Sequence, residues 1–120
     1  MGEKGAGRVV YFVSIPPTDS DRLSTMLGYA LASASMGLDV VLFYALDGAL
    51  TLKKAVFEGL KPEIKAKFSQ CLKAGCRVLL CSSAAEQYGI GKEDVVEGVE
   101  IADIETFYDY AAGADVVMGW

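Results

Sequence analysis

Three cysteines are the side chains of this 120-residue sequence best suited to covalent chemistry, and they are spaced five residues apart: Cys71, Cys76 and Cys81. Cys81 ends a short apolar run, and Ser82 and Ser83 begin a predicted helix directly after it. Amide N–H groups and the dipole at a helix start favour an anion, so this position favours thiolate over thiol, and both serines are candidate anion-stabilising residues. The sequence contains no histidine, the usual partner of a hydrolytic cysteine. We therefore interpret Cys81 as a thiol that carries a group.

The spacing of the cysteines argues against a shared metal site. If Cys76 and Cys81 lie on one strand, their odd separation points the two side chains to opposite faces. Five residues of strand also separate them by about 16 Å, too far for a disulfide or a common metal ion. The sequence has no C-x-x-C motif. We expect no metal and no cofactor, with Cys71 and Cys76 as small buried side chains.

Other polar side chains follow the first two predicted strands. Ser14 lies at the end of the first strand, and Asp47, Lys53 and Lys54 follow the second. Because the carboxyl ends of parallel strands meet at one edge of a sheet, these residues are candidates to border a pocket over Cys81. A lysine there would stabilise a thiolate or persulfide anion. The alternative is helix capping for Ser14, and a turn followed by a surface helix for the other three.

Phosphate binding is poorly supported. The glycines of the opening segment precede the first strand, whereas a dinucleotide loop must follow it. Residues 14–20, which run from the end of that strand into the next segment, contain no glycine and no lysine. A nucleotide-binding or small-ligand flavodoxin-like module is therefore the weakest of the functions considered.

The elements that must position Cys81 alternate along the chain. Strands are predicted at residues 9–15, 40–44, 76–81, 99–101 and 115–118. Helices are predicted at about residues 20–36, 62–74, 82–88 and 104–112. Thr18 or Ser20 is expected to cap the first helix and Asp103 the last. Residues 49–60 are ambiguous. This order predicts an α/β fold with a five-stranded, mostly parallel sheet and helices on both faces, a flavodoxin-like three-layer sandwich. We expect a flexible tail at residues 1–7 and a single domain at 8–120.

Composition and charge limit the partners. Residues 82–120 hold nine acids and one base, and residues 1–81 hold seven acids and ten bases, for a net charge of −5. An acidic chain argues against nucleic acid. No apolar run is long enough for a membrane span and no signal segment opens the sequence, so we expect a cytoplasmic protein. The apolar content of 52% and the apolar stretch 49–60 suggest a homo-oligomer.

Four segments stand in a characteristic order and spacing. The first consists of the opening strand, residues 19–22 and residues 34–40, where a predicted helix ends and the second strand begins. The other three are residues 42–48, 74–90 and 111–118. Together they resemble the DsrE/DsrF-like family of small sulfur-relay proteins, over nearly the whole chain after residue 7.

The resemblance implies a five-stranded parallel sheet, with trimers or hexamers as common assemblies. In sulfur-transferring members the acceptor cysteine ends the third strand, before a short helix and a Gly-Ile or Gly-Val, and Cys81 occupies that position ahead of Gly89-Ile90. Cys71 and Cys76 match no functional position. The implied function is a sulfurtransferase-type carrier that accepts a persulfide sulfur on Cys81 from a donor protein and passes it to an acceptor thiol. The alternative is a non-catalytic oligomeric binding or scaffold protein of the same fold, with an inert Cys81.

Overall fold

Five parallel strands form a single sheet in the order β4-β3-β2-β1-β5. A computed structural model describes residues 7–120, and its strands are β1 (Arg8–Val13), β2 (Asp39–Tyr44), β3 (Arg77–Cys81), β4 (Val99–Ala102) and β5 (Val116–Gly119). Every neighbouring pair of strands is parallel. The fold class predicted from the sequence is confirmed, with a sheet that is parallel throughout.

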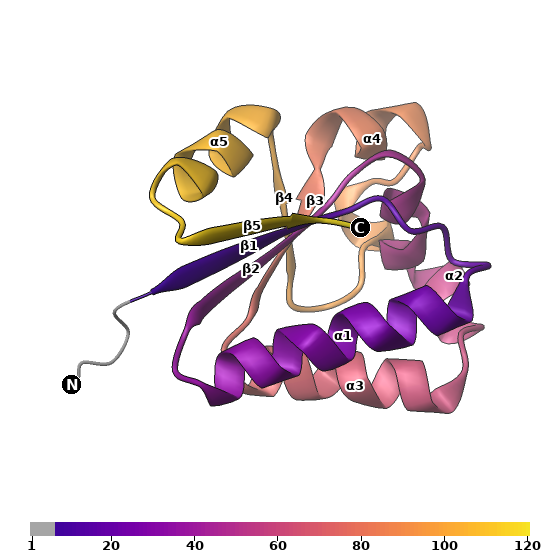
Figure 1. The fold of residues 1–120 in the computed structure, drawn as a ribbon. Coiled ribbons are helices and arrows are strands. Elements are labelled where there is room, and N and C mark those ends of the chain that lie inside the picture. The colour runs from indigo at the N-terminus through magenta and orange to yellow at the C-terminus, as the bar shows by residue number, and fades with distance from the viewer. Residues whose placement is uncertain (1–6) are drawn as a thin grey trace.

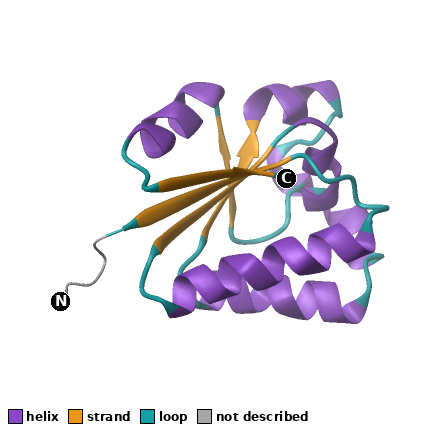
Figure 2. Ribbon diagram, in the orientation of Figure 1, coloured by secondary structure: helices purple, strands orange, loops and turns teal. Residues whose placement is uncertain are grey.

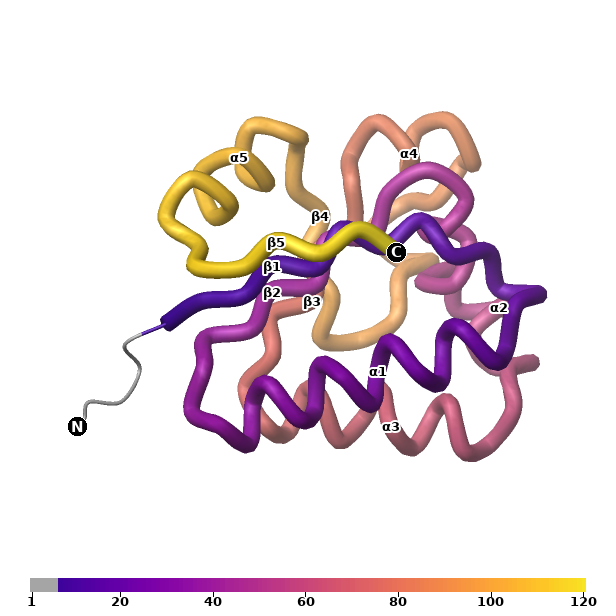
Figure 3. Tube along the Cα trace, viewed as in Figure 1, coloured from indigo at the N-terminus to yellow at the C-terminus, as the bar shows by residue number. Residues whose placement is uncertain are grey.

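Helices cover both faces of this sheet. On one face α1 (Ser20–Ser35) and α3 (Pro62–Lys73) pack side by side, and on the other lie α4 (Ser82–Gln87) and α5 (Ile104–Ala112) (Figures 1 and 3). Three short helical pieces complete the chain: the 3-10 helices η1 (Leu46–Leu52) and η2 (Lys92–Asp94), and α2 (Lys54–Glu58). Residues 49–60, ambiguous in sequence, therefore belong to η1, α2 and the turn that follows them. Figure 2 shows the three layers by secondary structure.

Two element boundaries differ from the sequence expectation for identifiable reasons. The N-cap of α1 is Asp19, not Thr18 or Ser20: its carboxylate accepts a hydrogen bond from the Arg22 amide at 3.2 Å. β1 ends at Val13 rather than at residue 15. Pro16 and Pro17 follow closely, and since proline carries no amide hydrogen the strand ladder cannot run on through them.

The start of β3 is set by the end of α3. The Cys76 amide donates to the Cys71 carbonyl at 3.0 Å and the Gly75 amide to the Leu72 carbonyl at 3.1 Å, while Gly75 has a φ of 93°. These two bonds form the turn that commonly closes a helix with a left-handed glycine. Because the Cys76 amide is used in the turn, the ladder of β3 begins at Arg77 rather than at Cys76.

The centre of the sheet is fully apolar. β2 lies between β3 and β1, and its residues from Val40 to Tyr44 are almost completely buried. Such a run is typical of a parallel strand covered on both faces. Among residues 7–120, no helix is long and apolar enough to cross a membrane.

The sequence predicts a flexible tail at residues 1–7, and of these residues the structure describes Gly7. Residues 1–6 lie outside the described part of the chain. Gly7 lies within it, where its carbonyl accepts a hydrogen bond from the Asp39 amide at 2.9 Å, next to the first pair of the β1–β2 register.

Candidate functional site

Cys81 lies where β3 meets α4. It is the last residue of β3, paired with Ala102 of β4, and its backbone forms the N-cap of α4. The strand–helix junction predicted from the sequence is therefore present at this residue. Cys81 is 7% exposed, and this exposed part faces a cavity of about 250 Å³. Because its side chain makes no capping hydrogen bond to α4, the sulfur remains available to the cavity.

The cavity is built from five parts of the chain. β1, the segment around the start of η1, the end of β3, α4 and α5 all contribute to its lining, which consists of Phe12, Ala45, Leu46, Cys81, Ser83, Ala84, Gln87 and Ile104. The β3–β4 register explains how Ile104 comes to line the same cavity as Cys81: Ala102 pairs with Cys81, and Ile104 begins α5 two residues later. Among residues 7–120, the side chains that line this cavity are all uncharged.

The serine candidates separate in the structure. Ser83 lines the cavity beside Cys81, whereas Ser82 is not part of the lining. One residue of helix turns the side chain by about 100°, so the two serines project in different directions from the first turn of α4. Ser14 lies elsewhere: its amide and its hydroxyl both donate to the Trp120 carbonyl, each at 2.8 Å. Ser14 therefore holds the carboxyl end of the chain against the end of β1.

Asp47 and the two lysines lie outside the cavity lining. The exposed Asp47 carboxylate accepts a hydrogen bond from the Tyr88 hydroxyl at 2.7 Å, which ties η1 to the end of α4 and raises the pKa of Tyr88. Lys53 and Lys54 follow only after the seven residues of η1, and the Lys53 backbone forms a bridge with Val95. The residues of η1 therefore separate both lysines from the end of β2, and neither lysine lines the cavity that contains Cys81.

η1 forms a cavity wall with unusual backbone geometry. Leu46 has a φ of 53°, in the left-handed region that a leucine rarely adopts, and its side chain is 61% exposed. Gly48 is fully buried against the end of β1, where an added Cβ would meet the Val13 carbonyl oxygen. Asp47-Gly48 is a turn signal in the sequence, but no pattern in the sequence indicates that Leu46, Phe12, Gln87 and Ile104 line the cavity.

Cys71 and Cys76 form a separate thiol pair beneath the opposite face of the sheet. They are 0% and 5% exposed, which confirms the prediction of small buried side chains. Their thiols interact: the contact with Cys76 raises the pKa of Cys71, and the contact with Cys71 lowers the pKa of Cys76. The turn that ends α3 accounts for this, since it commonly brings these two positions into side-chain contact. Among residues 7–120, no three His, Cys, Asp or Glu side chains gather as a metal site.

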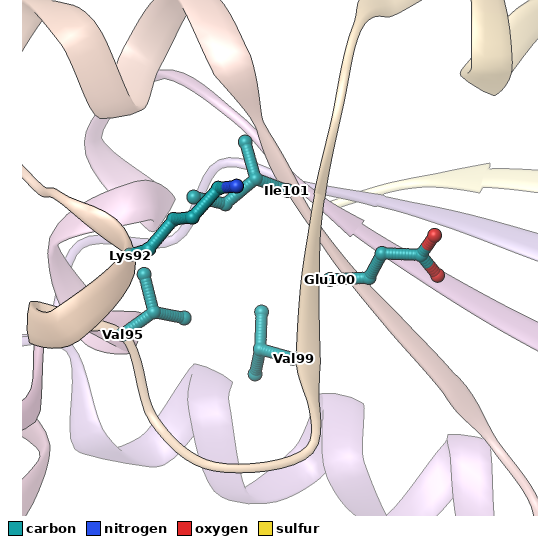
Figure 4. Close-up of a pocket in the computed structure, with 5 residues that line it drawn as sticks. All are labelled: Lys92, Val95, Val99, Glu100 and Ile101. Atoms are coloured by element: carbon teal, nitrogen blue, oxygen red, sulfur yellow. The ribbon is translucent and has the colours of Figure 1, made fainter.

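A second hollow lies along the edge strand β4 and has a volume of about 410 Å³. Figure 4 shows Lys92, Val95, Val99 and Ile101 around its opening, with the Glu100 carboxylate directed away from it. Its lining contains no cysteine. The smaller cavity, which contains Cys81, is therefore the candidate functional site.

The fold and the site define a class: small α/β domains with a parallel five-stranded sheet and a cysteine at the carboxyl end of its third strand. The chain belongs to the DsrE/DsrF-like family, whose model matches residues 7–119. The family suggested by the sequence is confirmed, and at the level of the family this membership indicates sulfur relay.

A relative and two solved structures are similar to this chain in sequence or in fold. The uncharacterized protein MK0008 of Methanopyrus kandleri is 27% identical over 96% of this chain and 95% of its own length. The crystal structure of the ychN protein from E. coli superposes with a TM-score of 0.75 at 21% identity, covering 95% of this chain and 99% of that one. The protein of unknown function MTH1491 from Methanobacterium thermoautotrophicum has a TM-score of 0.70 at 16% identity, covering 93% and 98%. The two structures support the fold alone.

Proposed function

We propose that this protein is a sulfur carrier of the sulfurtransferase type, which accepts a persulfide sulfur on Cys81 and passes it to an acceptor thiol. The observation that carries the proposal is the position of Cys81: it ends β3 and faces a cavity in a chain of the DsrE/DsrF-like family. The other two cysteines are buried beneath the opposite face and line no described cavity.

The transfer requires only thiolate exchange. The Cys81 thiolate attacks the outer sulfur of a donor persulfide, R–S–SH, and a new S–S bond forms as the donor S–S bond breaks. The donor leaves as R–S⁻ and Cys81–S–SH remains. An acceptor thiolate then attacks the outer sulfur of Cys81–S–SH and releases the Cys81 thiolate. Both the nucleophile and the leaving group are thiolates, so the reaction proceeds without a histidine base.

The surroundings of Cys81 suit a persulfide. The amide N–H groups in the first turn of α4 have no partners within that helix, and they directly follow Cys81. Ser83 adds a hydroxyl group to the same cavity. These neutral donors can hydrogen-bond a persulfide anion. They take the stabilising role that the sequence predicts for a lysine.

The main competitor is a non-catalytic scaffold of the same fold, and one observation favours it: Cys81 is only 7% exposed. Thiol labelling at neutral pH separates the two functions. A sulfur acceptor reached through the cavity should react with a small, uncharged alkylating reagent faster than Cys71 and Cys76 do. Labelling of Cys81 as slow as that of the two buried thiols would favour the scaffold.

The direct test is uptake of sulfur from a persulfide donor, followed by intact mass. We expect wild type to gain the mass of one sulfur atom, Cys81→Ala to gain none, and Cys76→Ala to behave as wild type. Cys76→Ala is a matched control because it removes another buried thiol of the same strand region. An adduct that persists in Cys81→Ala would contradict the proposal.

We further propose that the protein assembles into homo-oligomers, with trimers or hexamers as the expected sizes. In the sequence the apolar stretch 49–60 favours an oligomer, but its residues Ala49 and Leu52 are buried within the single chain. The support for assembly therefore comes from another surface. The edge strand β5 leaves Val116 and Val117 48% and 50% exposed. An apolar strand at an open sheet edge is a surface that proteins commonly cover.

A further inference from the structure

The walls of the Cys81 cavity are apolar. Five of the eight lining residues have apolar side chains, Phe12, Ala45, Leu46, Ala84 and Ile104, and the polar ones, Ser83 and Gln87, are neutral. A charged group that enters such a cavity loses water without gaining an opposite charge, which is costly. An apolar group of fragment size loses water favourably there. The lining therefore favours a donor with an uncharged, apolar body.

The charged residues that stand next to the lining residues along the chain are all of one sign. Every charged residue within two positions of a lining residue along the chain is acidic: Asp47, Glu86, Asp103 and Glu105. All four are exposed. Two are held in place, since Asp47 accepts from the Tyr88 hydroxyl at 2.7 Å and Asp103 accepts from the Thr106 hydroxyl at 3.0 Å. Like-signed charges beside a low-dielectric cleft focus the potential, so these four carboxylates disfavour an anion next to the lining.

We infer that the Cys81 cavity selects sulfur donors by charge: it accepts a persulfide with an apolar, uncharged body and discriminates against the same donor with an anionic body. The inference rests on the proposed function, in which Cys81 is the sulfur acceptor. The step is R–S–SH + Cys81–S⁻ → Cys81–S–SH + R–S⁻, in which the outer sulfur keeps its hydrogen and no external oxidant or reductant is consumed. Selectivity arises because R contacts the apolar walls, where a carboxylate meets no opposite charge, while the outer sulfur meets Cys81.

Two donors that differ by one charge test this inference. Benzyl hydropersulfide has an uncharged body, and 4-carboxybenzyl hydropersulfide adds one carboxylate to the same ring. The rate of one-sulfur adduct formation on Cys81 is measured by rapid quench and intact mass at low salt, and each rate is divided by the rate for a small peptide thiol. We expect wild type to prefer the benzyl donor by about tenfold, with the preference falling as salt rises.

A pair of lysine substitutions locates the origin of the preference. Ile104→Lys places a cation at the mouth from a residue that is 38% exposed, and we expect it to bring the two donors close to parity. Met36→Lys makes the same change in net charge at a 75% exposed position that follows α1, outside the cavity lining. We expect Met36→Lys to keep the wild-type preference, since a distant exposed charge is screened.

The outcomes separate this inference from the proposed function. Equal normalised rates for the two donors in wild type, or a preference for the carboxylate, would overturn the charge selection and leave Cys81 as a sulfur acceptor. A preference unchanged in Ile104→Lys would overturn the assignment to the cavity mouth. An absence of adduct on Cys81 with either donor, while the peptide thiol reacts, would overturn the proposed function and the inference together.

Discussion

Gly48→Ala should disrupt the wall of the Cys81 cavity although it adds a single methyl group. Gly48 is fully buried, and its added Cβ would meet the Val13 carbonyl oxygen and lie 3.1 Å from both the Val13 carbonyl carbon and the Ser14 Cα. These are backbone atoms, so no flexible side chain can move aside. The Val13 carbonyl also accepts the Ala45 amide at 3.0 Å, which ties η1 to the end of β1. Relief of the clash therefore requires η1 to move away from β1.

The expected cost follows from two contributions. Overpacking a well-filled site costs about 1–3 kcal/mol, and loss of the hydrogen bond between Ala45 and Val13 costs about 1 kcal/mol. We therefore expect Gly48→Ala to lower the free energy of unfolding by about 3 kcal/mol and the midpoint of thermal unfolding by about 10 °C. Because η1 and the residue before it supply Ala45 and Leu46 to the cavity, the rate of Cys81 persulfidation should fall as well.

Urea denaturation and sulfur uptake are measured on Gly48→Ala and on a matched control, Gly28→Ala. Gly28 lies within α1, where an added Cβ would approach only the Lys67 Nζ at 3.8 Å, an ordinary contact. Alanine is preferred over glycine in a helix interior by about 1 kcal/mol, so Gly28→Ala should stabilise the protein and leave sulfur uptake unchanged. The same substitution thus has opposite signs at the two positions. A Gly48→Ala protein as stable as wild type would refute the placement of η1 against β1.

Three further results are expected. Tyr44→Phe removes a buried hydroxyl with no hydrogen-bond partner among the described residues, and should raise the free energy of unfolding in urea by about 1 kcal/mol; a loss of stability would contradict this. Burial, with a contribution from Cys71, raises the pKa of Tyr44 above its ordinary 10.0, so the unfolded chain releases this proton first. Wild type should therefore lose stability as pH rises above about 10, and Tyr44→Phe should lose less in the same alkaline titration; equal losses would count against the burial of this hydroxyl. Sedimentation at micromolar concentration should give a multiple of the monomer mass, and Val117→Lys should reduce it, whereas a monomeric wild type would exclude the proposed assembly.

Much of the fold could be predicted because it depends on local pattern. Continuous apolar runs are typical of buried parallel strands, and Gly37 and Gly75 mark helix ends where the backbone has a positive φ. The junction at Cys81 was predictable for the same reason, since an apolar run gives way to Ser82 and Ser83 within one residue. The spacing of Cys76 and Cys81 predicts that the two thiols lie apart, and they do, although Cys76 lies in the turn before β3 rather than on the strand.

The cavity could not be predicted because it depends on contacts between distant segments. The left-handed φ of Leu46 and the close approach of Gly48 to Val13 are fixed by how η1 fits the end of β1, and hydrophobic periodicity carries no signal for either. The approach of Ile104 to Cys81 requires the β3–β4 register, which sequence alternation leaves open. The sequence predicts Lys53 and Lys54 near Cys81 because both follow the carboxyl end of β2, whereas the seven-residue 3-10 helix η1 stands between β2 and the lysines.

The central claim is that Cys81 accepts and releases a persulfide sulfur, and peptide mapping tests it most directly. Wild-type protein is treated with one equivalent of a persulfide donor, digested without reductant, and compared with a sample that then receives an acceptor thiol. We predict one additional sulfur on the peptide that contains Cys81, none on the peptides that contain Cys71 or Cys76, and its loss once the acceptor is added. Sulfur found on Cys71 or Cys76 instead, or retained on Cys81 in the presence of the acceptor, would contradict the account.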